Sequence, residues 1–503
     1  MRILGIVLAC LLLLAAPALS EEEADYVSDF SYWADGWYAR SNGGASVFLT
    51  DHGAALGIEG RTADWHSMGR DFTLAEGESY QLSVLVRQDE ADEARFVLSV
   101  AHSHQGQESY ENIAVATAKR GEWTEISGTY LAGQYERFVL YVETQGAATL
   151  SYAIKDFVLR GKTQAFGAED LPSLAEAYKA YFPFGTAVTY MEAVNRPRMD
   201  FYASQFNILT PGNELKPDSV LNVAVSRMLA AEDETAVAVH LTAAKPILDY
   251  AQEKGIPVHG HVLVWHSQTP KAFFHEGYDP RRPMVGREVM LGRLEHYIEA
   301  VFKATGEQYP GLIVSWDVVN EAVEDGKTSL RDSLWKTVIG DDYVERAFEF
   351  ARKHAPKGVK LYYNDYNTAY EPKQTGIANL LKKLQEAGTV DGYGFQMHHD
   401  IRQPGYRAIE KAFKRIAALG LCLRISELDV TVPDPSEASF AAQAKLYGQV
   451  MKLALSYADQ VDAVQVWGVM DDLSWRAKSF PLLFDAWAKP KPAFYAVLEA
   501  VQD

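Results

Sequence analysis

The sequence has almost no cysteine, which limits the chemistry open to it. Only Cys10 and Cys422 occur in 503 residues. Cys10 lies inside the apolar run of an expected leader, so processing would leave Cys422 alone. A single cysteine forms no intramolecular disulfide and supplies no metal site built on thiolates. Cys422, in the apolar stretch GLCLRI, is expected to pack in the core.

Basic residues are also scarce. The chain has 48 Lys and Arg against 67 Asp and Glu, a formal net charge of −19. Nucleic acid is therefore not an expected partner, because phosphate binding needs basic patches. A neutral polymer would not be repelled, and 10 Trp and 27 Tyr provide rings that can stack on sugars.

Long apolar runs are missing too. The run at residues 3–14 is too short to span a bilayer, so we expect no membrane partner. Arg2 precedes this run, and Ala18-Leu19-Ser20 offers small residues at the cleavage positions. This pattern predicts that residues 1–20 are a secretory signal peptide and that the protein is secreted and extracellular.

The chain is longer than one hydrophobic core normally accommodates, which indicates two domains. Residues 24–162 contain short alternating segments separated by Gly, Asp and Asn, as at 80–86, 95–100, 122–128 and 137–143. This spacing predicts an all-β sandwich. In the last segment the alternation places Val139, Tyr141 and Glu143 on a solvent face suited to binding. Residues 162–170 are too few for a long linker.

In residues 171–503, apolar segments alternate with helical ones. Eight strands alternating with helices predict an α/β fold, a (β/α)₈ TIM barrel with its chemistry at the carboxyl ends of the strands. The expected strands are 182–188, 205–210, 256–265, 312–319, 359–365, 392–398, 421–427 and 463–469. The expected helices include 237–254, 287–305, 342–354, 373–387 and 438–457.

Two of these strands end in glutamate. The run SWDVVNEA (315–322) places Asn320 and Glu321 at one strand end, and LRISELDV (423–430) places Glu427 and Asp429 at another. A pair of carboxyl groups is the minimum equipment for glycoside hydrolysis. Because neighbours in a regular strand point to opposite faces, Asn320 and Glu321 can both reach a substrate only if the backbone leaves strand geometry there.

Polar and aromatic residues follow most of the other predicted strands as well. Such convergence on one end of a barrel is hard to explain by packing alone. These residues are Asn213, Lys216, His259, His261, Trp265, His266, Gln268, Asn364, Asp365, Gln396, His398, His399, Trp467, Asp471 and Trp475.

The motifs GHVLVWHSQTP (260–270), WDVVNEA (316–322), GFQMHH (394–399), ISELDV (425–430) and VWGVMDDLSW (466–475) closely resemble glycoside hydrolase family 10, the retaining endo-1,4-β-xylanases. The resemblance implies hydrolysis of xylan and xylo-oligosaccharides without a required cofactor. It implies that Glu321 is the acid/base and Glu427 the nucleophile, supported by Asn320, His398 and Asp429. The sugar-holding residues that it implies are Asn213, Lys216, His261, Trp265, Gln268, Gln396, Trp467 and Trp475.

One position departs from the family pattern. The family usually has Glu before the Asn of T-x-E-N, whereas TPGNELK (210–216) has Gly212 there. Glu214 lies nearby but is not the aligned residue. We therefore expect a sugar contact to be lost or rebuilt, which affects fine specificity rather than chemistry.

The first half resembles carbohydrate-binding module family 22, a xylan-binding β-sandwich. The resemblance rests on GWYAR (36–40), GRTADWH (60–66), SYENIA (109–114) and LYVE (140–143). No residue cluster in this half looks catalytic. The resemblance allows a structural calcium ion, for which the sequence has no distinctive loop. The ligand-contacting residues that it implies are Arg40, Trp65, Tyr110, Tyr141 and Glu143.

Three other interpretations remain open at this point. The pair His259 and His261, with His398 and His399, would suit a metal-dependent hydrolase. The barrel could instead bind a glycan without cleaving it, or hydrolyse a different β-1,4-glycan. Chelation, a reducing-sugar assay and product analysis on xylan against cellulose separate these alternatives from a xylanase.

Overall fold

The computed structural model divides the chain into two compact units, residues 1–164 and 165–503. It describes residues 26–502, except 29, 31–33, 35, 42–44, 51–53, 73, 105–106, 136, 162–170, 194 and 486–487. The predicted signal peptide and the segment between the domains therefore lie outside the described residues.

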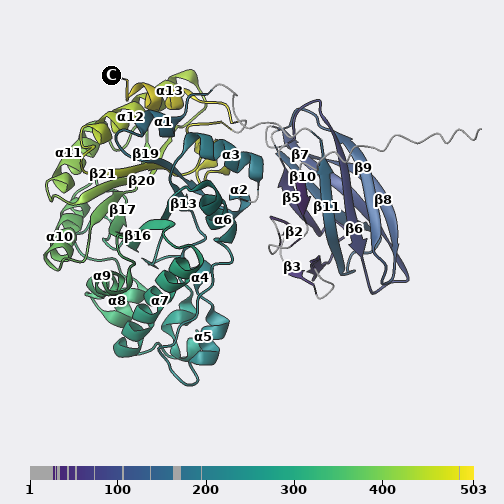
Figure 1. The fold of residues 1–503 in the computed structure, drawn as a ribbon, viewed down its shortest axis with the longest axis horizontal. Coiled ribbons are helices and arrows are strands. Elements are labelled where there is room, and N and C mark those ends of the chain that lie inside the picture. The colour runs from purple at the N-terminus through teal and green to yellow at the C-terminus, as the bar shows by residue number, and fades with distance from the viewer. Residues whose placement is uncertain are drawn as a thin grey trace, which may run out of the picture. The chain divides into compact units, whose positions relative to one another are not determined.

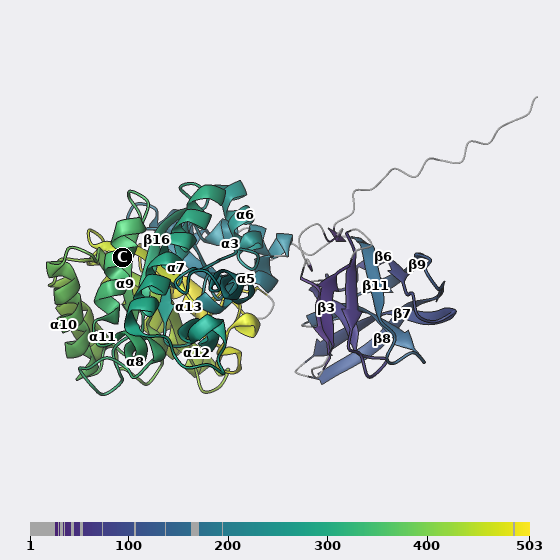
Figure 2. The ribbon, with the colours of Figure 1, turned by 90° about the horizontal axis from the view of Figure 1, so that it is seen from below.

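The first unit is a sandwich of two antiparallel sheets, as the sequence predicted (Figures 1 and 2). One sheet has the order β3-β4-β11-β6-β9, with β1 paired to β11, and the other has the order β2-β5-β10-β7-β8. Apolar side chains that point inward from both sheets form one core. The strands are β1 Tyr26–Ser28, β2 Tyr38–Arg40, β3 Ser46–Leu49, β4 Leu56–Glu59, β5 Ser67–Phe72, β6 Ser79–Arg87, β7 Glu93–His104, β8 Gln107–Lys119, β9 Thr124–Leu131, β10 Arg137–Gln145 and β11 Tyr152–Arg160.

Strand β10 confirms one face of its predicted alternation and corrects the other. Phe138, Leu140 and Val142 belong to the sandwich core. On the opposite face Tyr141 is only 3% exposed, so the expectation that it faces solvent was wrong. The guanidinium of Arg40 lies 3.8 Å from the centre of the Tyr141 ring and covers it, a contact between strands that alternation within one strand cannot reveal.

The second unit is the predicted barrel. Eight parallel strands pair in the order β14-β13-β12-β21-β20-β18-β17-β16, and pairing of β14 with β16 closes the ring. Two short strands, β15 Val264–Trp265 and β19 His398–Asp400, extend it at one end. The eight strands are β12 Phe184–Val188, β13 Leu209–Pro211, β14 Val258–Gly260, β16 Ile313–Asn320, β17 Lys360–Asp365, β18 Gly392–Phe395, β20 Cys422–Thr431 and β21 Val461–Val466.

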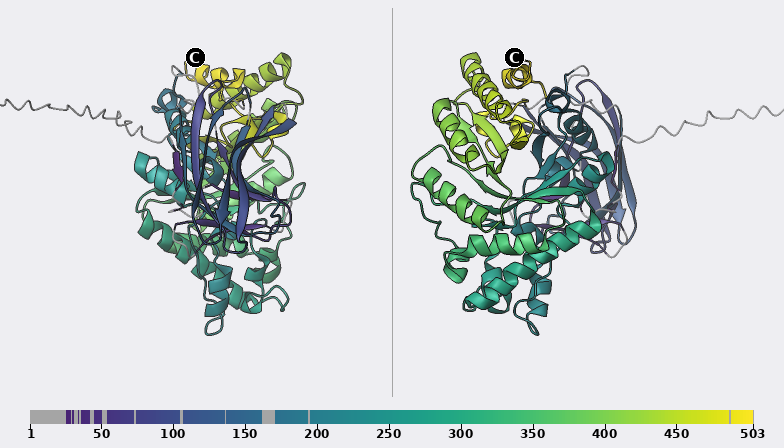
Figure 3. Two further views of the ribbon diagram at one scale, coloured as in Figure 1. Left: turned by 90° about the vertical axis from the view of Figure 1, so that its right-hand side faces the viewer. Right: turned by 60° about the vertical axis from the view of Figure 1, so that its left-hand side comes forward.

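Helices form an outer layer around the barrel strands (Figures 1 and 3). They are α1 Leu174–Tyr178, α2 Tyr190–Ala193, α3 Arg196–Gln205, α4 Pro217–Val220, α5 Val223–Leu229, α6 Lys245–Lys254, α7 Arg287–Gln308, α8 Leu334–Ile339, α9 Tyr343–His354, α10 Lys373–Glu386, α11 Tyr406–Ala417, α12 Glu437–Leu455 and α13 Pro492–Glu499. Short 3₁₀ turns occur at η1 Lys271–Phe274, η2 Glu276–Tyr278, η3 Asp471–Leu473 and η4 Ala477–Ser479. No helix in the described part of the chain is long and apolar enough to cross a membrane.

Two predicted elements begin well after their expected starts, and the strand expected at 256–265 is divided into β14 and β15. The helix expected at 237–254 begins only at Lys245, with Pro246 in its first turn, where a missing N–H costs least. The strand expected at 205–210 begins at Leu209, because Gln205 still belongs to α3, a helix capped by Asn195. Both differences shorten an element without changing the topology.

Strand β20 has the opposite difference, since it continues to Thr431 beyond its expected end at 427. Glu427 and Asp429 therefore both lie within a strand, two residues apart and on the same face. Strand β16 stops at Asn320, and the backbone of Glu321 has a φ of 56°. The predicted departure from strand geometry is thus confirmed, at a cost of about 1–2 kcal/mol for a residue with a side chain.

Gly260 shows how tightly the barrel core is packed. A methyl group at Gly260 would lie 2.2 Å from the indole of Trp316, whereas one at Gly286 would meet nothing within 4 Å. We expect Gly260→Ala to lower the free energy of unfolding by about 1–3 kcal/mol, because overpacked cores must shift. Thermal denaturation of both alanine variants tests this, and equal melting temperatures would contradict the packing described.

Candidate active site

One cleft of about 620 Å³ opens at the carboxyl ends of the barrel strands. Its wall is rich in polar and aromatic residues that the sequence predicted at strand ends, brought together from six of the eight barrel strands. The cleft is lined by Asn213, Lys216, His261, Trp265, Gln268, Asn320, Glu321, Gln396, His398, Glu427, Trp467 and Trp475. Asp429 does not line the cleft and lies behind His398, fully buried.

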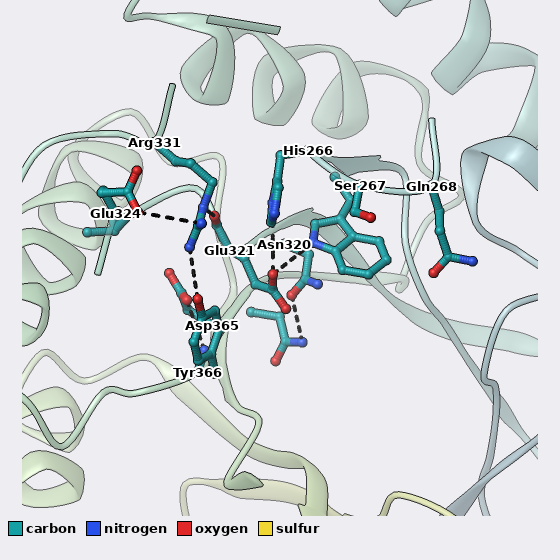
Figure 4. Close-up of polar contacts among 12 residues, drawn as sticks. His266, Ser267, Gln268, Asn320, Glu321, Glu324, Arg331, Asp365 and Tyr366 are labelled. Atoms are coloured by element: carbon teal, nitrogen blue, oxygen red, sulfur yellow. Dashed lines mark hydrogen bonds and ion pairs between the residues drawn. The ribbon is translucent and has the colours of Figure 1, made fainter. Parts of the chain in front are cut away.

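Neutral donors hold the carboxylate of Glu321. The indole nitrogen of Trp265 donates to Oε2 at 2.9 Å, and the amide of Gln396 donates to Oε1 at 2.9 Å. Nδ1 of His266 lies 3.8 Å from Oε2 (Figure 4). The carboxylate is therefore fixed in direction, and its side chain stays 14% exposed to the cleft.

Glu427 has a different, cationic environment. Nε2 of His398 lies 3.1 Å from Glu427 Oε2, and Nδ1 of the same ring lies 2.9 Å from Asp429 Oδ2. Burial alone would lower the pKa of His398, but the charge and hydrogen bonds of the two carboxylates raise it to about 10. His398 is consequently an imidazolium at neutral pH.

The charged ring acts on both acidic neighbours. Burial raises the pKa of Glu427, but the hydrogen bond from His398 and nearby imidazole charge outweigh burial and lower it. Burial also acts to raise the pKa of Asp429, but the charges of His398 and Arg476 outweigh burial and lower it. Arg476 donates to Asp429 Oδ1 at 2.7 Å and Trp475 donates to Oδ2 at 2.9 Å. Glu427 is thus an ionised carboxylate facing the cleft.

Asn364 is a contact of Glu427 that the sequence did not assign. Its amide nitrogen donates to Glu427 Oε1 at 2.7 Å and to Asn320 Oδ1 at 3.1 Å, and its oxygen accepts from Ser426 at 2.7 Å. Gln396 also donates to Asn320 Oδ1, at 3.0 Å. Asn364 and Gln396 therefore both donate to the side-chain oxygen of Asn320, and the amide nitrogen of Asn320 points away from them. The position of Asn364 at a predicted strand end was a usable signal for a site residue. Only the closed barrel shows that its side chain points toward Glu427.

A second polar group lies further along the cleft. The ammonium of Lys216 donates to Asn213 Oδ1 and Gln268 Oε1, both at 2.9 Å, and lies 4.8 Å from the Trp265 ring centre. Burial lowers the pKa of Lys216. Three predicted sugar-holding residues therefore form one hydrogen-bonded unit beside an indole face.

The two histidines of the HGH motif have partners inside the barrel. Nδ1 of His261 lies 2.9 Å from Asp317 Oδ2, and Nδ1 of His259 lies 2.8 Å from the Ser315 hydroxyl. Asp317, noted only as ionisable in the sequence, fixes the ring of His261 from below the cleft. Among the described residues, no group of three or more His, Cys, Asp or Glu is arranged to hold a metal ion.

Gly212 leaves the cleft wall open, and Glu214 does not fill the gap. A Cβ at Gly212 would come no closer than 3.7 Å to Thr189 or Val188, so packing does not require glycine there. The carboxylate of Glu214 is buried and accepts from the backbone N–H of Tyr190 at 2.6 Å and of Asn213 at 2.9 Å. It shapes the loop instead of facing the cleft.

Three other cleft residues were not singled out in the sequence. Tyr366 follows β17, Arg476 lies in the segment after β21, and Glu192 lies in α2, directly after β12. Tyr366 comes directly after Asn364 and Asp365, so its place after a strand was a usable signal. For Arg476 and Glu192, the path of the backbone after the strand decides whether the side chain reaches the cleft, and no local sequence pattern indicates that path.

The residues predicted to bind ligand in the first unit gather on its five-stranded sheet. Tyr141 and Glu143 lie on β10, Arg40 on β2 and Tyr110 on β8, with cross-strand pairing that places them on one face. Glu143 accepts from Ser99 at 3.2 Å, and burial raises its pKa. A Cβ at Gly69 would lie 2.5 Å from Arg40, so glycine there lets Arg40 lie flat on Tyr141.

Two aromatic rings among the predicted ligand-binding residues are exposed. Tyr110 is 61% exposed, and its hydroxyl donates to Glu108 at 2.8 Å. Trp65, in the loop before β5, is 47% exposed and meets His66 edge to face. Exposed rings beside buried polar groups are the arrangement that sugar faces need.

Comparison with known proteins places this geometry in a family. The model of glycosyl hydrolase family 10 matches residues 173–500, and a carbohydrate-binding domain model matches residues 26–150. The chain belongs to glycosyl hydrolase family 10. Its first unit is accordingly a carbohydrate-binding module, and its barrel is a family 10 barrel.

Two curated relatives match this family 10 protein over most of its length. It is 34% identical to endo-1,4-β-xylanase A of Thermotoga neapolitana, over 88% of this chain and 43% of that one. It is 31% identical to exoglucanase XynX of Acetivibrio thermocellus, over 92% and 44%. The chain thus spans less than half the length of these curated relatives.

A solved structure covers the same two parts. The CBM22-1–GH10 modules of a Clostridium thermocellum endo-1,4-β-D-xylanase, complexed with xylohexaose, are 31% identical with a TM-score of 0.62. The match covers 94% of this family 10 chain and 97% of the other. It agrees with the predicted class of the binding module.

The imidazolium of His398 makes the site sensitive to pH. We expect His398→Gln to move the acidic limb of kcat/KM to higher pH, because Glu427 loses the charge that lowers its pKa. The pH profile on an activated substrate measures this shift. His354→Gln, which removes an imidazole beside Glu295 on the outer helices, is the matched control.

The substitution His398→Gln should also change how the stability of the protein depends on pH. The folded pKa of His398, about 10, lies above the unfolded value of about 6.5. Its stabilisation is therefore complete below about pH 6.5 and disappears as pH rises through about 10. The gap in melting temperature between the wild type and His398→Gln should shrink across that window, and a constant gap would contradict a charged His398.

Proposed function

We propose that this protein is a secreted endo-1,4-β-xylanase that cleaves internal β-1,4-xylosidic bonds of xylan with retention of configuration. The observation that carries the proposal is the unlike pair of carboxylates in one cleft. Glu427 contacts an imidazolium and an amide, whereas Glu321 contacts two neutral N–H donors. An ionised nucleophile beside a separately held acid/base is what a double displacement needs.

In the first step, the Glu427 carboxylate attacks the anomeric carbon while the bond from that carbon to the leaving oxygen breaks. Glu321 gives its proton to that oxygen, which departs as a hydroxyl group. In the second step, Glu321 takes a proton from water, and the resulting hydroxide displaces Glu427 from the same carbon. Asn320 is placed to bond a sugar hydroxyl while the charge develops, and no cofactor is needed.

The substrate assignment rests on the relatives and on the cleft. A xylanase and a structure with bound xylohexaose resemble this chain, as does a protein named an exoglucanase. Action on another β-1,4-glycan is therefore the second candidate. Product analysis on xylan against cellulose decides between them, and the absence of new reducing ends on either would favour a protein that binds glycans without cleaving them.

The secreted location is proposed from sequence alone. Its support is Arg2, the apolar run at residues 3–14 and the small residues Ala18-Leu19-Ser20. Detection of the mature protein outside the cell, with its N-terminus after Ser20, tests it.

The assigned roles predict azide products of opposite configuration. With Glu427→Ala, azide takes the place of the missing nucleophile on an activated aryl xylobioside and should give the α-glycosyl azide. With Glu321→Ala, azide attacks the glycosyl-enzyme on Glu427 and should give the β-azide, while xylan cleavage falls by on the order of 10²–10⁴. NMR of the products reads the configuration, and the same anomer from both variants would reject the assignment.

For the first unit, we propose binding of xylan through Trp65 and Tyr110 without chemistry. Replacing either ring by Ala should cost about 1 kcal/mol, or roughly fivefold in affinity for insoluble xylan. Hydrolysis of short soluble oligosaccharides should not change. Leu131→Ala, on the other sheet and 66% exposed, is the control. Retention on xylan equal to the wild type in both ring variants would count against this surface.

A further inference from the structure

The main chain of Glu321 adopts a conformation that the strand does not supply. Its φ of 56° lies in the left-handed region, directly after β16 ends at Asn320. The N–H of Glu321 donates to the Asn364 carbonyl at 2.9 Å. The direction of the Glu321 side chain depends on this strained turn. The turn is therefore held in place only if the Glu321 carbonyl, like the N–H, has a hydrogen-bond partner.

The loop that follows Glu321 returns to provide that partner. Val323 and Leu330 form a bridge, and the N–H of Arg331 donates to the Ala322 carbonyl at 2.7 Å. This return places Nε of Arg331 3.3 Å from the Glu321 carbonyl (Figure 4). The guanidinium thus bonds the backbone of the residue whose side chain faces the cleft.

The other nitrogens of Arg331 reach further groups. Nη2 donates to the Tyr366 hydroxyl at 3.0 Å, and Nη1 lies 3.5 Å from Glu324 (Figure 4). The Tyr366 hydroxyl itself donates to Asp325 at 2.6 Å, and the ammonium of Lys373 lies 3.6 Å from the ring centre. Tyr366 is therefore held at its hydroxyl and over its ring, while it lines the cleft beside Glu321.

We infer that Arg331 is a positioning residue, which fixes the Glu321 backbone and the Tyr366 ring with one guanidinium. The planar fork suits this task because it offers donors in a rigid geometry to two acceptors at once. Arg331 touches no reacting atom and acts by aiming the carboxyl group of Glu321 at the leaving oxygen. The inference rests on the proposed function, in which Glu321 is the acid/base.

The test uses aryl β-xylobiosides whose phenols differ in acidity, because a general acid matters most for poor leaving groups. For each substrate kcat/KM reports the step that forms the glycosyl-enzyme. We compare the full-length wild type with Arg331→Ala and Arg331→Lys. Arg352→Ala is the matched control, since Arg352 is a partly buried arginine that bonds Asp391 at the opposite end of the barrel.

We expect Arg331→Ala to steepen the dependence of kcat/KM on the phenol pKa. The least acidic phenol should lose on the order of 10²-fold, the scale of a misaimed catalytic group, and the most acidic one much less. Arg331→Lys, which can reach only one acceptor, should fall between Arg331→Ala and the wild type. Arg352→Ala should keep the wild-type slope.

A wild-type slope in folded Arg331→Ala would overturn the inference, as would a loss equal for all phenols. If Arg331→Ala fails to fold, as judged by circular dichroism, Arg331→Lys decides by the same criterion. A wild type that cleaves none of the xylobiosides would overturn the proposed function and this inference with it, whereas a cleaving wild type with unchanged Arg331 variants overturns the inference alone.

Discussion

The positive charge on His398, held between two buried carboxylates, is the interaction on which the site depends. Without it, Glu427 and Asp429 would be two buried carboxylates on one strand face, and burial would favour their protonated forms. With it, Glu427 is ionised although only 4% exposed. The ring is itself oriented, since Nδ1 faces Asp429 and Nε2 faces Glu427.

The rest of the cleft gives the two glutamates, Glu427 and Glu321, different surroundings. Glu427 lies within β20 and is contacted by a cation, whereas Glu321 lies just beyond a strand in a left-handed turn and is contacted by Trp265 and Gln396. Two carboxyl groups with unlike surroundings can take unlike roles. The amide groups of Asn364, Asn320 and Gln396 form a chain of hydrogen bonds that connects Glu427 to Glu321.

The binding module obeys a related rule on its own sheet. Arg40 is spread over Tyr141 because Gly69 leaves room for it, and Glu143 is partly buried beside it. The buried polar groups present a fixed pattern of hydrogen-bond donors and acceptors. The exposed rings of Trp65 and Tyr110 present apolar surface on which a sugar can stack. In both units, therefore, buried contacts orient the site side chains, and the exposed parts of these side chains are free to contact the ligand.

The sequence by itself determined the two-domain division, the sandwich, the barrel and the residues at the strand ends, because alternation and apolar runs are local signals. It also required the turn at Glu321, since neighbours in a strand diverge. The tertiary structure alone decided that Tyr141 lies beneath Arg40, that Asn364 bonds Glu427 and that Arg331 returns to the Glu321 carbonyl. These contacts join segments far apart in the chain or across a loop, where backbone geometry, not local pattern, sets which atoms meet.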